Sequence, residues 1–417
     1  MFKIAILGCG VVGSGVADIL ISKSASISIK FDENVSLSKI LDVRDLPDSA
    51  YAKYLTKNKE DIFNDSDIKL VVITIGGNTI AYEYAKKALE SGRHVVTSNK
   101  EVVAAHAREL TKLAFENNVR FLYEASTGGG IPIIRPINIC LSGNDVTEIM
   151  GILNGTTNYI LTKMKKDGMS FEDALAKAQQ KGYAEADPTA DVDGHDAARK
   201  IAILSTLAYD MFVDYKDISC KGIRNISLQD IDLASKAGFT IKLIARSSIS
   251  EKGIKASVEP LMLSNEHMLS TVNSSYNAIF LKGSYVGDSM FYGKGAGKLP
   301  TASAVVGDII DILGRGNEKS LPNFVSKEAV LDKTSIDISR YLLRINTKAT
   351  KLTDDELKSS TKKIFGSTSN FSGKLQNNAY VCGIITGIIA FKELEHKISD
   401  FEKLVNVEVE NIIKIID

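Results

Sequence analysis

The feature that most constrains the fold is a glycine turn directly after the first apolar run. The run Phe2–Leu7 is followed by G-C-G-V-V-G and then by Ser14–Ile21, which has the pattern of a helix. In such a unit, Gly8 permits the tight turn, Gly10 lets the backbone approach a pyrophosphate, and Gly13 lets the helix pack on the strand. The N–H groups that open the helix would face the phosphates. The turn therefore predicts dinucleotide binding, with an unliganded tight turn as the alternative.

The loop after the second expected strand, Val35–Val43, bears on the choice of dinucleotide. Asp42 is a candidate to bind the hydroxyls of the adenosine ribose, whereas Arg44 lies where a guanidinium could meet a 2′-phosphate. The two residues point to opposite cofactors. We expect NADP and leave NAD open, because an arginine in such a loop can equally be an ordinary surface residue.

Apolar runs and helical patterns keep alternating up to Glu124, which is typical of a doubly wound parallel sheet. Further strands are expected at Lys69–Ile75, His94–Thr97 and Arg120–Glu124, and helices at Ile80–Ser91 and Glu101–Glu116. Lys100 lies just beyond the carboxyl end of one strand, where ligands of open sheets collect, although a solvated loop lysine is the alternative. Residues 1–135 are thus expected to form a Rossmann dinucleotide-binding domain, completed by a returning helix around residues 300–330.

The stretch that ends this domain reads Y-E-A-S-T-G-G-G-I-P. Three consecutive glycines allow backbone carbonyls to converge, and Glu124 could add an anionic oxygen, so a site for a monovalent cation is conceivable. A flexible hinge between two domains is the simpler interpretation.

After Pro136 the pattern changes to sequential strands with intervening helices, which predicts an α+β substrate-binding and dimerisation domain over residues 136–300. Its strands are expected at Val146–Leu153, Ile218–Ile226, Phe239–Ser247, Ile254–Pro260 and Ala278–Val286, and one helix at Phe171–Gly182. The segment N-G-T-T-N-Y, with Asn154 and Thr156, could hold a polar substrate or only cap a helix that begins near Asn158. A second glycine-rich turn, with Gly295 and Gly297, opens the returning helix and could bring backbone N–H groups to the cofactor.

The stretch Gly182–Lys200 carries five carboxylates, a histidine, an arginine and a lysine around two glycines and a proline. We expect a helix to open near Asp193, because Asp193 and Asp196 stand in N-cap and N3 relation before an apolar stripe. Asp196 and Lys200 would then lie one turn apart on one face. The alternative is an exposed ion pair beside a solvated acidic loop.

The last part of the chain follows a polar break at Gly314–Lys333. Its expected elements are a strand at Tyr341–Asn346, a helix at Asp354–Ile364, strands within Asn370–Ala390, a helix at Lys392–Leu404 and a strand at Val405–Ile416. This βαββαβ order is the ferredoxin-like plan, and we expect a small separate module over residues 335–417.

Composition excludes several classes of function. Lys plus Arg and Asp plus Glu both count 51, so the net charge is zero and a nucleic-acid partner is not expected. No apolar run approaches the roughly 20 residues of a membrane span, and a strand-like start leaves no room for a signal peptide. Four cysteines without CxxC spacing indicate neither a disulfide framework nor a zinc site. We expect a cytoplasmic protein.

Between Gly8 and Val305 the motifs occur in an order that resembles the homoserine dehydrogenases. They are G-C-G-V-V-G, T-S-N-K, Y-E-A-S-T-G-G-G-I-P, G-I-L-N-G-T-T-N-Y-I, G-Y-A-E-A-D-P-T-A-D-V-D-G-H-D-A-A-R-K and G-A-G-K-L-P-T-A-S-A-V. The resemblance implies interconversion of L-homoserine and L-aspartate 4-semialdehyde with NAD(P), on the route to threonine, methionine and isoleucine. It also implies a homodimer or homotetramer.

The resemblance carries site residues over to this sequence. It implies Lys200 as the proton-transferring lysine and Lys100 as a second catalytic lysine. The positions expected at the substrate are Glu185, Asp191, Asp196, Asn154 and Thr156. The positions expected at the cofactor are Gly8, Gly10, Val11, Val12, Gly13, Arg44, Lys100, Gly182 and Gly297. The positions expected at a monovalent cation, possibly sodium, are Glu124, Thr127, Gly129 and Ile131. One departure is Ala190, where some relatives have a second aspartate, so one outer carboxylate is missing.

The implied chemistry needs both lysines. Oxidising an alcohol requires a base within reach of the hydroxyl proton and a cation that steadies the developing alkoxide. A lysine that acts as base needs its pKa lowered from about 10.4 by burial or by a neighbouring cation. We therefore expect Lys100 and Lys200 each to lower the pKa of the other, while Glu185, Asp191 and Asp196 bind the substrate ammonium and orient Lys200.

The C-terminal module resembles the ACT domains appended to many homoserine dehydrogenases, with R-Y-L-L-R-I as its first strand. The glycine-containing turn by which such domains grip an effector amino acid is replaced by T-K-A-T-K-L-T-D. We therefore hypothesise that the module mainly supports assembly and that inhibition by threonine is weak or lost; a tight, saturable inhibition curve would overturn this. An alternative for the whole chain is a regulatory protein that senses NAD(P)H without turnover.

Overall fold

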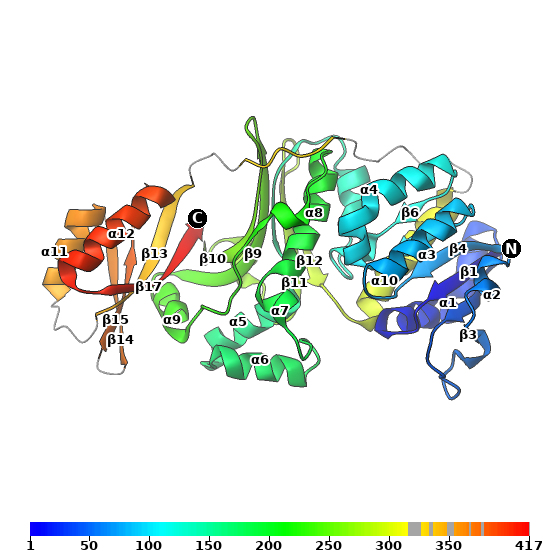
Figure 1. Cartoon of the computed structure of the whole chain (residues 1–417), viewed down its shortest axis with the longest axis horizontal. Helices are drawn as coiled ribbons and strands as arrows, with labels where there is room; N and C mark the ends of the chain where they lie inside the picture. The colour runs from blue at the N-terminus through cyan, green and yellow to red at the C-terminus, as the bar shows by residue number, and fades with distance from the viewer. Residues whose placement is uncertain (316–326, 333–336, 348–353, 367, 377–378, 417) are drawn as a thin grey trace.

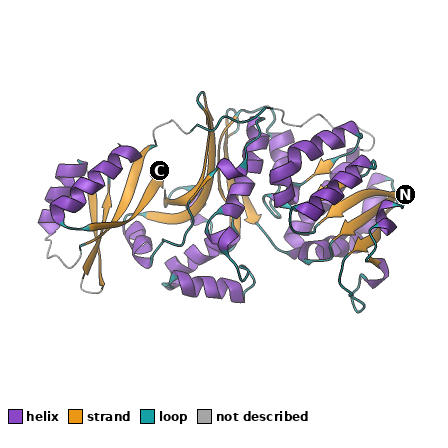
Figure 2. Ribbon diagram, in the orientation of Figure 1, coloured by secondary structure: helices purple, strands orange, loops and turns teal. Residues whose placement is uncertain are grey.

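The structure is a computed structural model that describes the chain except for residues 316–326, 333–336, 348–353, 367, 377–378 and 417. Three parts follow one another along the longest axis of the molecule (Figure 1): an N-terminal α/β domain, a central sheet with its helices, and a C-terminal module. Figure 2 shows that strands run through all three parts and that helices cover them. The expected fold class, a Rossmann domain followed by mixed α and β structure, is confirmed.

The N-terminal domain is a six-stranded parallel sheet in the order β3-β2-β1-β4-β5-β6, the strand order of the Rossmann fold. Its strands are β1 (Phe2–Leu7), β2 (Val35–Leu41), β3 (Leu55–Thr56), β4 (Ile68–Ile73), β5 (His94–Thr97) and β6 (Phe121–Leu122). Its helices are α1 (Val11–Phe31), α2 (Glu60–Phe63), α3 (Thr79–Glu90) and α4 (Lys100–Glu116). The near-continuous apolar runs of β1 and β4 are buried on both faces, as a doubly covered sheet requires.

Helix α10 (Lys298–Arg315) returns from the central domain and completes this one. Its residues Ala302 and Val305 are fully buried in one apolar cluster with Val16 and Leu20 of α1. The expectation of a returning helix is therefore correct. By length and composition alone α1 could cross a membrane, a test that a buried core helix also passes. Its contacts with α10 are those of a core helix in a folded domain.

The chain passes between the first two domains twice, and glycines let the two crossings touch. The Gly130 N–H donates to the Lys294 carbonyl at 3.0 Å. A Cβ added at Gly129 would lie 2.2 Å from the Gly295 carbonyl oxygen, and a Cβ at Gly130 would lie 2.7 Å from a side-chain carbon of Pro300. Because backbone lies against backbone at Gly129, the joint has no room for a side chain there.

We expect Gly129→Ala to lower the free energy of unfolding by at least about 3 kcal/mol. Its φ of +60° disfavours an L side chain, and the added methyl group must also displace backbone. Gly92→Ala is the matched control, since Gly92 has a similar φ of +71° but open space around its Cβ position, and it should cost only about 1 kcal/mol. Denaturant unfolding of both variants measures the difference; equal losses would show that the contact with Gly295 is unimportant.

The central domain is built on a mixed sheet with the strand order β12-β11-β7-β9-β10. Its strands are β7 (Val146–Ile152), β8 (Ser219–Cys220), β9 (Phe239–Ser250), β10 (Gly253–Ser264), β11 (Tyr276–Gly283) and β12 (Gly287–Lys294). Its helices are α5 (Gly155–Asp167), α6 (Phe171–Gln180), α7 (Thr189–Val192), α8 (His195–Tyr209) and α9 (Leu228–Lys236). The strand expected over Ile218–Ile226 was wrong, because only Ser219 and Cys220 pair, with β10.

The C-terminal module has the expected βαββαβ order. Its elements are β13 (Ile338–Asn346), α11 (Asp354–Phe365), β14 (Ser369–Gln376), β15 (Ala379–Ile385), β16 (Ile389–Ala390), α12 (Phe391–Val405) and β17 (Glu408–Ile416). Its strands lie in the order β17-β13-β15-β14, which is that of a ferredoxin-like sheet. This is consistent with an ACT-like module. The effector turn considered above lies mostly in residues 348–353, and the polar break at Gly314–Lys333 mostly in residues 316–326, both outside the described residues.

The module is not separate, contrary to expectation. Strand β17 pairs in parallel with β10 from Leu261↔Lys414 to Leu263↔Ile416, so one sheet runs from the central domain into the module. A buried ion pair supports the junction: Arg344 on β13 lies 3.2 Å from the carboxylate of Asp230 on α9, which is fully buried. Sequence periodicity does not show pairing between strands so far apart in the chain.

Candidate active site

The first lysine of the predicted site lies where the sheet of the N-terminal domain ends. Strand β5 stops at Thr97, and Asn99 caps α4 by accepting the N–H groups of Glu101 and Val102 through its side chain. Lys100 is therefore the first residue of α4, at the carboxyl end of a parallel strand. This is the position predicted for it, and its side chain is about one-third exposed.

The second lysine of the predicted site belongs to the central domain. Helix α8 begins at His195 after Gly194, whose φ of +89° only glycine adopts readily, and no side chain caps the helix. The predicted cap was therefore wrong: Asp193 belongs to the preceding turn and pairs with Arg224 at 2.6 Å. The predicted spacing is confirmed, because Asp196 and Lys200 lie one turn apart and are both buried.

One carboxylate joins the two lysines across the domain boundary. The Lys200 ammonium donates to one oxygen of Asp196 at 2.8 Å and to the Leu153 carbonyl at 2.8 Å. The Lys100 ammonium forms an ion pair with the other oxygen of Asp196. A carboxylate as buried as that of Asp196 needs such partners to remain ionised. We call this the Lys100–Asp196–Lys200 cluster.

Helix α5 adds an amide and a second carboxylate to this cluster. The side-chain oxygen of Asn154 caps α5 by accepting the Thr157 N–H, while its NH₂ group donates to Asp191 at 2.7 Å and to Asp196 at 3.0 Å. Thr156 donates its hydroxyl to the Tyr183 carbonyl at 2.5 Å. The segment N-G-T-T-N-Y thus both caps a helix and borders the cluster, so the two interpretations left open above are compatible.

The two lysines differ in acidity. Burial lowers the pKa of Lys200, and the neighbouring Lys100 lowers it further, against the opposing effect of Asp196. Burial also lowers the pKa of Lys100, but the Asp196 carboxylate outweighs it and leaves this pKa above its ordinary value. The expected mutual lowering of the two pKa values therefore agrees with the direction for Lys200 and is wrong for Lys100, so Lys200 loses its proton more readily than Lys100.

The two other acidic residues of the site differ in their surroundings. Asp191 is partly buried, and burial together with Asp196 raises the pKa of its carboxyl group. Glu185 is exposed on the loop after α6, and within the described part of the chain its carboxylate has no recorded partner. Gly182 opens the same loop with a φ of +71°. The structure thus gathers Asp191 at the cluster and leaves Glu185 in solvent.

The glycine turn at β1 fits a pyrophosphate. A Cβ at Gly13 would lie 1.8 Å from the Gly8 carbonyl oxygen, so this glycine is needed for the close packing of α1, whereas the Cβ position at Gly10 is open. No side chain caps α1, so its first N–H groups stay available to phosphate oxygens. Val11 is exposed at this end of the helix. Gly297 has a φ of +121° and precedes α10, which packs on α1.

Asp42 and Arg44 interact with each other. The Asp42 carboxylate accepts the Cys9 N–H at 2.7 Å and the Arg44 Nε–H at 2.9 Å, and the Arg44 guanidinium also donates to the Cys9 carbonyl at 2.9 Å. Arg44 holds the pKa of Asp42 well below its usual range. Asp42 is therefore engaged by the protein, which weighs against its candidate role at a ribose.

Sequence reasoning missed Lys57 at the same end of the domain. Lys57 lines one pocket with Asp42 and Arg44, and its ammonium lies 2.6 Å from the Asp45 carboxylate. Strand β3 has only two residues and was not recognised in the sequence. A residue just after a parallel strand lies at the ligand edge of the sheet, so recognising β3 would have placed Lys57 there. The role of the Leu153 carbonyl was also missed, and no sequence pattern marks a backbone acceptor of this kind.

The structure does not support the Glu124 carboxylate as a ligand of the predicted cation. Both carboxylate oxygens of Glu124 already accept backbone N–H groups, from Ile133, Ile134 and Arg135 at 2.5 to 2.8 Å. Thr127 is fully buried, and among the described residues its hydroxyl has no hydrogen-bond partner. In the described residues no group of three or more His, Cys, Asp or Glu could hold a metal. The carboxylate therefore ties the backbone of the domain joint together.

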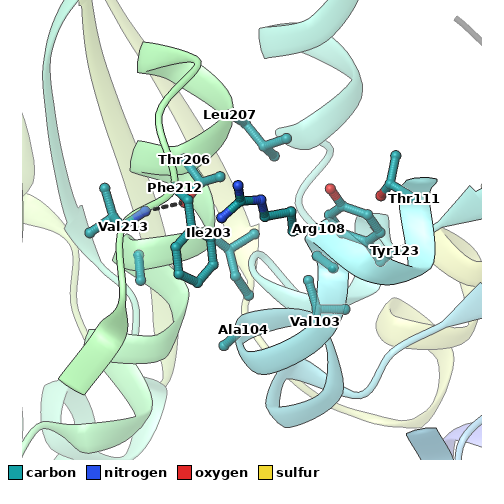
Figure 3. A pocket seen from close by; sticks show the side chains of 12 residues that line it. Val103, Ala104, Arg108, Thr111, Tyr123, Ile203, Thr206, Leu207, Phe212 and Val213 are labelled. Carbon is teal, nitrogen blue, oxygen red and sulfur yellow. Dashed lines mark hydrogen bonds between the residues drawn. The ribbon is translucent and has the colours of Figure 1, made fainter. Parts of the chain in front are cut away.

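A small cavity lies between α4 and α8. Figure 3 shows Val103 and Arg108 of α4 across from Ile203 and Leu207 of α8. Its walls are mostly apolar, and its volume of about 30 Å³ leaves room for about two water molecules. It contains none of the predicted site residues and is too small for an amino acid, so it is a gap in the domain boundary and not the substrate site.

A Rossmann sheet whose ligand edge meets a buried lysine and aspartate from a second domain defines an NAD(P)-dependent oxidoreductase. Two family models match the chain: "Homoserine dehydrogenase, NAD binding domain" over residues 8–124 and "Homoserine dehydrogenase" over residues 132–310. The chain belongs to the homoserine dehydrogenase family.

Individual relatives and solved structures agree with this family assignment. The homoserine dehydrogenase of Bacillus subtilis (strain 168) is 42% identical over 315 residues, which are 75% of this chain and 72% of the relative. The crystal structure of a homoserine dehydrogenase from Thiobacillus denitrificans superposes with a TM-score of 0.88 at 31% identity, covering 100% of this chain and 98% of the other. A hyperthermophilic archaeal homoserine dehydrogenase mutant in complex with NADPH superposes with a TM-score of 0.64 at 29% identity, covering 74% and 97%.

Proposed function

We propose that this chain oxidises L-homoserine to L-aspartate 4-semialdehyde and catalyses the reverse reduction, with the Lys100–Asp196–Lys200 cluster as its catalytic centre. The single observation that carries the assignment of residues is the shared Asp196 carboxylate, which brings one lysine from each domain to the same point. The product would serve the synthesis of threonine, methionine and isoleucine. The alternative considered above was a sensor that binds the dinucleotide without turnover. A sensor needs no proton-transferring group, so it does not explain a buried base beside a charged lysine.

The two lysines divide the proton chemistry. Lys200, whose pKa burial lowers, accepts the hydroxyl proton of the alcohol, and Lys100, whose pKa Asp196 raises, steadies the negative charge on that oxygen. The nicotinamide of the bound dinucleotide supplies the hydride acceptor. Asn154 holds Asp191 and Asp196 in place and Thr156 lies at the start of α5, where we propose that the polar end of the substrate binds, with Glu185 and Asp191 at its ammonium group.

The cofactor would bind along the glycine turn, at Gly8, Gly10, Val11, Val12 and Gly13, with Gly182 and Gly297 bordering it. We propose that NADP is preferred and NAD accepted. Arg44 supports this choice, because its guanidinium neutralises Asp42 and is still about half exposed, so it can pair with a 2′-phosphate. The archaeal relative in complex with NADPH is in agreement with this preference.

Arg44→Ala should raise the KM for NADP by about tenfold and leave the KM for NAD equal or lower. The variant removes a charge-assisted partner of the phosphate and frees the Asp42 carboxylate for a ribose diol. Steady-state kinetics with each dinucleotide at saturating homoserine measures both values. Lys53→Ala, at an exposed residue of the same loop region, is the control. An unchanged ratio of the two KM values would refute the assignment of Arg44.

The decisive experiment for the function is a spectrophotometric assay. Purified protein is incubated with L-homoserine and either NAD or NADP, and the absorbance of the reduced nicotinamide is followed. We expect homoserine-dependent reduction of the cofactor, faster with NADP. Binding of dinucleotide without any turnover in either direction would support the sensor instead.

Four further properties are proposed. The chain assembles as a homodimer or homotetramer, and the exposed Met290 and Tyr292 on edge strand β12 support a contact there; molar mass in solution tests this. A monovalent cation would be held by main-chain oxygens of Glu124, Thr127, Gly129 and Ile131, since the Glu124 carboxylate is occupied. The protein is cytoplasmic, and its C-terminal module supports assembly more than inhibition by threonine.

A further inference from the structure

The loop Tyr183–Pro188 is the part of the proposed substrate site that no helix or strand holds. It joins α6 to α7 and carries Glu185, whose side chain is exposed. Where the Glu185 carboxylate lies therefore depends on how the main chain of this loop is fixed. A loop of mostly exposed residues has few packing contacts to fix it, so individual hydrogen bonds decide its position.

The start of the loop is anchored by backbone and by one side chain. The Tyr183 N–H donates to the Ala178 carbonyl at 2.9 Å, and the Tyr183 carbonyl accepts the Thr156 hydroxyl at 2.5 Å. Ala184 is buried, and the tyrosine rings of Tyr159 and Tyr183 meet edge to face with centroids 5.0 Å apart. These contacts end at Ala184, one residue before Glu185.

A different side chain holds the loop at Glu185 itself. The Gln179 amide, from the last turn of α6, donates to the Glu185 carbonyl at 3.1 Å and, more weakly, to the Ala186 carbonyl at 3.4 Å. A primary amide carries two N–H groups and can therefore serve two carbonyls at once. The next residue, Gln180, is exposed and has no recorded contact of this kind within the described residues.

We propose that Gln179 is a positioning residue for substrate binding: its amide fixes the main chain at Glu185 and thereby sets where that carboxylate meets the substrate ammonium. The proposal rests on the role proposed above for Glu185. Gln179 does not itself touch the Lys100–Asp196–Lys200 cluster, so its loss changes binding of homoserine and leaves the chemical step intact.

The test is steady-state kinetics on Gln179→Ala, with Gln180→Ala as the matched control. Loss of neutral hydrogen bonds to the loop should raise the KM for homoserine by about three- to tenfold. The turnover number and the KM for the cofactor should stay within about twofold of wild type. Gln179→Glu, which has nearly the same size but no N–H donors and adds a charge beside an acidic loop, should raise the KM for homoserine further. Circular dichroism and thermal unfolding show whether each variant is folded.

A double-variant cycle with Glu185→Gln separates this proposal from the function itself. If Gln179 acts through Glu185, then Gln179→Ala adds little to the KM of a chain that already carries Glu185→Gln. Equal effects in both backgrounds would overturn the proposal. The proposal for Gln179 also fails if Gln179→Ala leaves the KM for homoserine unchanged while Glu185→Gln raises it. In that case the proposed enzyme function is unaffected. An unaltered KM in Glu185→Gln would remove the role of Glu185 and this proposal together.

Discussion

We expect Lys200→Met to lower the turnover number for homoserine oxidation by at least about 100-fold, while the dinucleotide still binds. The variant keeps an unbranched apolar side chain of similar length in a buried position, so α8 should retain its packing. What it removes is the amine of the cluster whose pKa burial holds below its ordinary value. Lys100 cannot replace it as base, because Asp196 keeps that ammonium charged.

Two measurements check this result. Stopped-flow and steady-state assays give the turnover number, and fluorescence titration with NADPH gives the affinity for the cofactor. Lys181→Met, at an exposed lysine before the acidic loop, is the matched control and should leave both quantities near wild type. Turnover of Lys200→Met within about tenfold of wild type would show that another group moves the proton.

Asp196→Asn has the second large effect, on stability and turnover together. The amide keeps the size of the side chain but leaves two ammonium groups without the carboxylate they share, one of them buried. Removing one partner of a buried ion pair costs about 3 kcal/mol or more of unfolding free energy. Turnover should fall by about 100-fold, because Lys100 loses the charge that keeps it protonated.

The pH dependence of Asp196→Asn distinguishes this mechanism from mere unfolding. Asp196 raises the pKa of Lys200, so its removal lowers that pKa further, and the limb of the pH profile of kcat/KM that reports the free base shifts to lower pH. Denaturant unfolding and pH profiles measure the two effects. Asp193→Asn is the control, since Asp193 pairs with Arg224 at the surface and should cost less than about 1 kcal/mol. A profile that keeps its wild-type position would contradict the role of Asp196.

Local pattern was sufficient to predict most of the fold. The strand His94–Thr97 was placed correctly, because a buried parallel strand is a continuous apolar run. Strand β12 was missed, since Gly287 and Gly293 gave it the composition of a turn and its residues alternate only between exposed and half-buried. The pairing of β17 with β10 was also missed, because register between distant strands depends on tertiary packing.

The sequence predicted those features of the candidate site that depend on spacing along the chain. Helical periodicity places Asp196 and Lys200 one turn apart, and strand order places Lys100 at the ligand edge of its sheet. Neither rule says that Lys100 reaches Asp196 from another domain, nor that Arg44 neutralises Asp42. The predicted lowering of the Lys100 pKa was wrong for the same reason: burial does lower this pKa, but the Asp196 carboxylate from the other domain outweighs that effect.

Because β17 pairs with β10, the C-terminal module covers part of the edge of the central sheet. Without the module, the end of β10 from Leu261 to Leu263 would present unpaired N–H and C=O groups to an extended chain, whereas Ser257 and Val258 would stay paired with β8. A shortened homologue must therefore shield this edge by other means, such as a charged side chain, a proline or a neighbouring subunit. Selection on the module would then persist even where no small molecule regulates the enzyme.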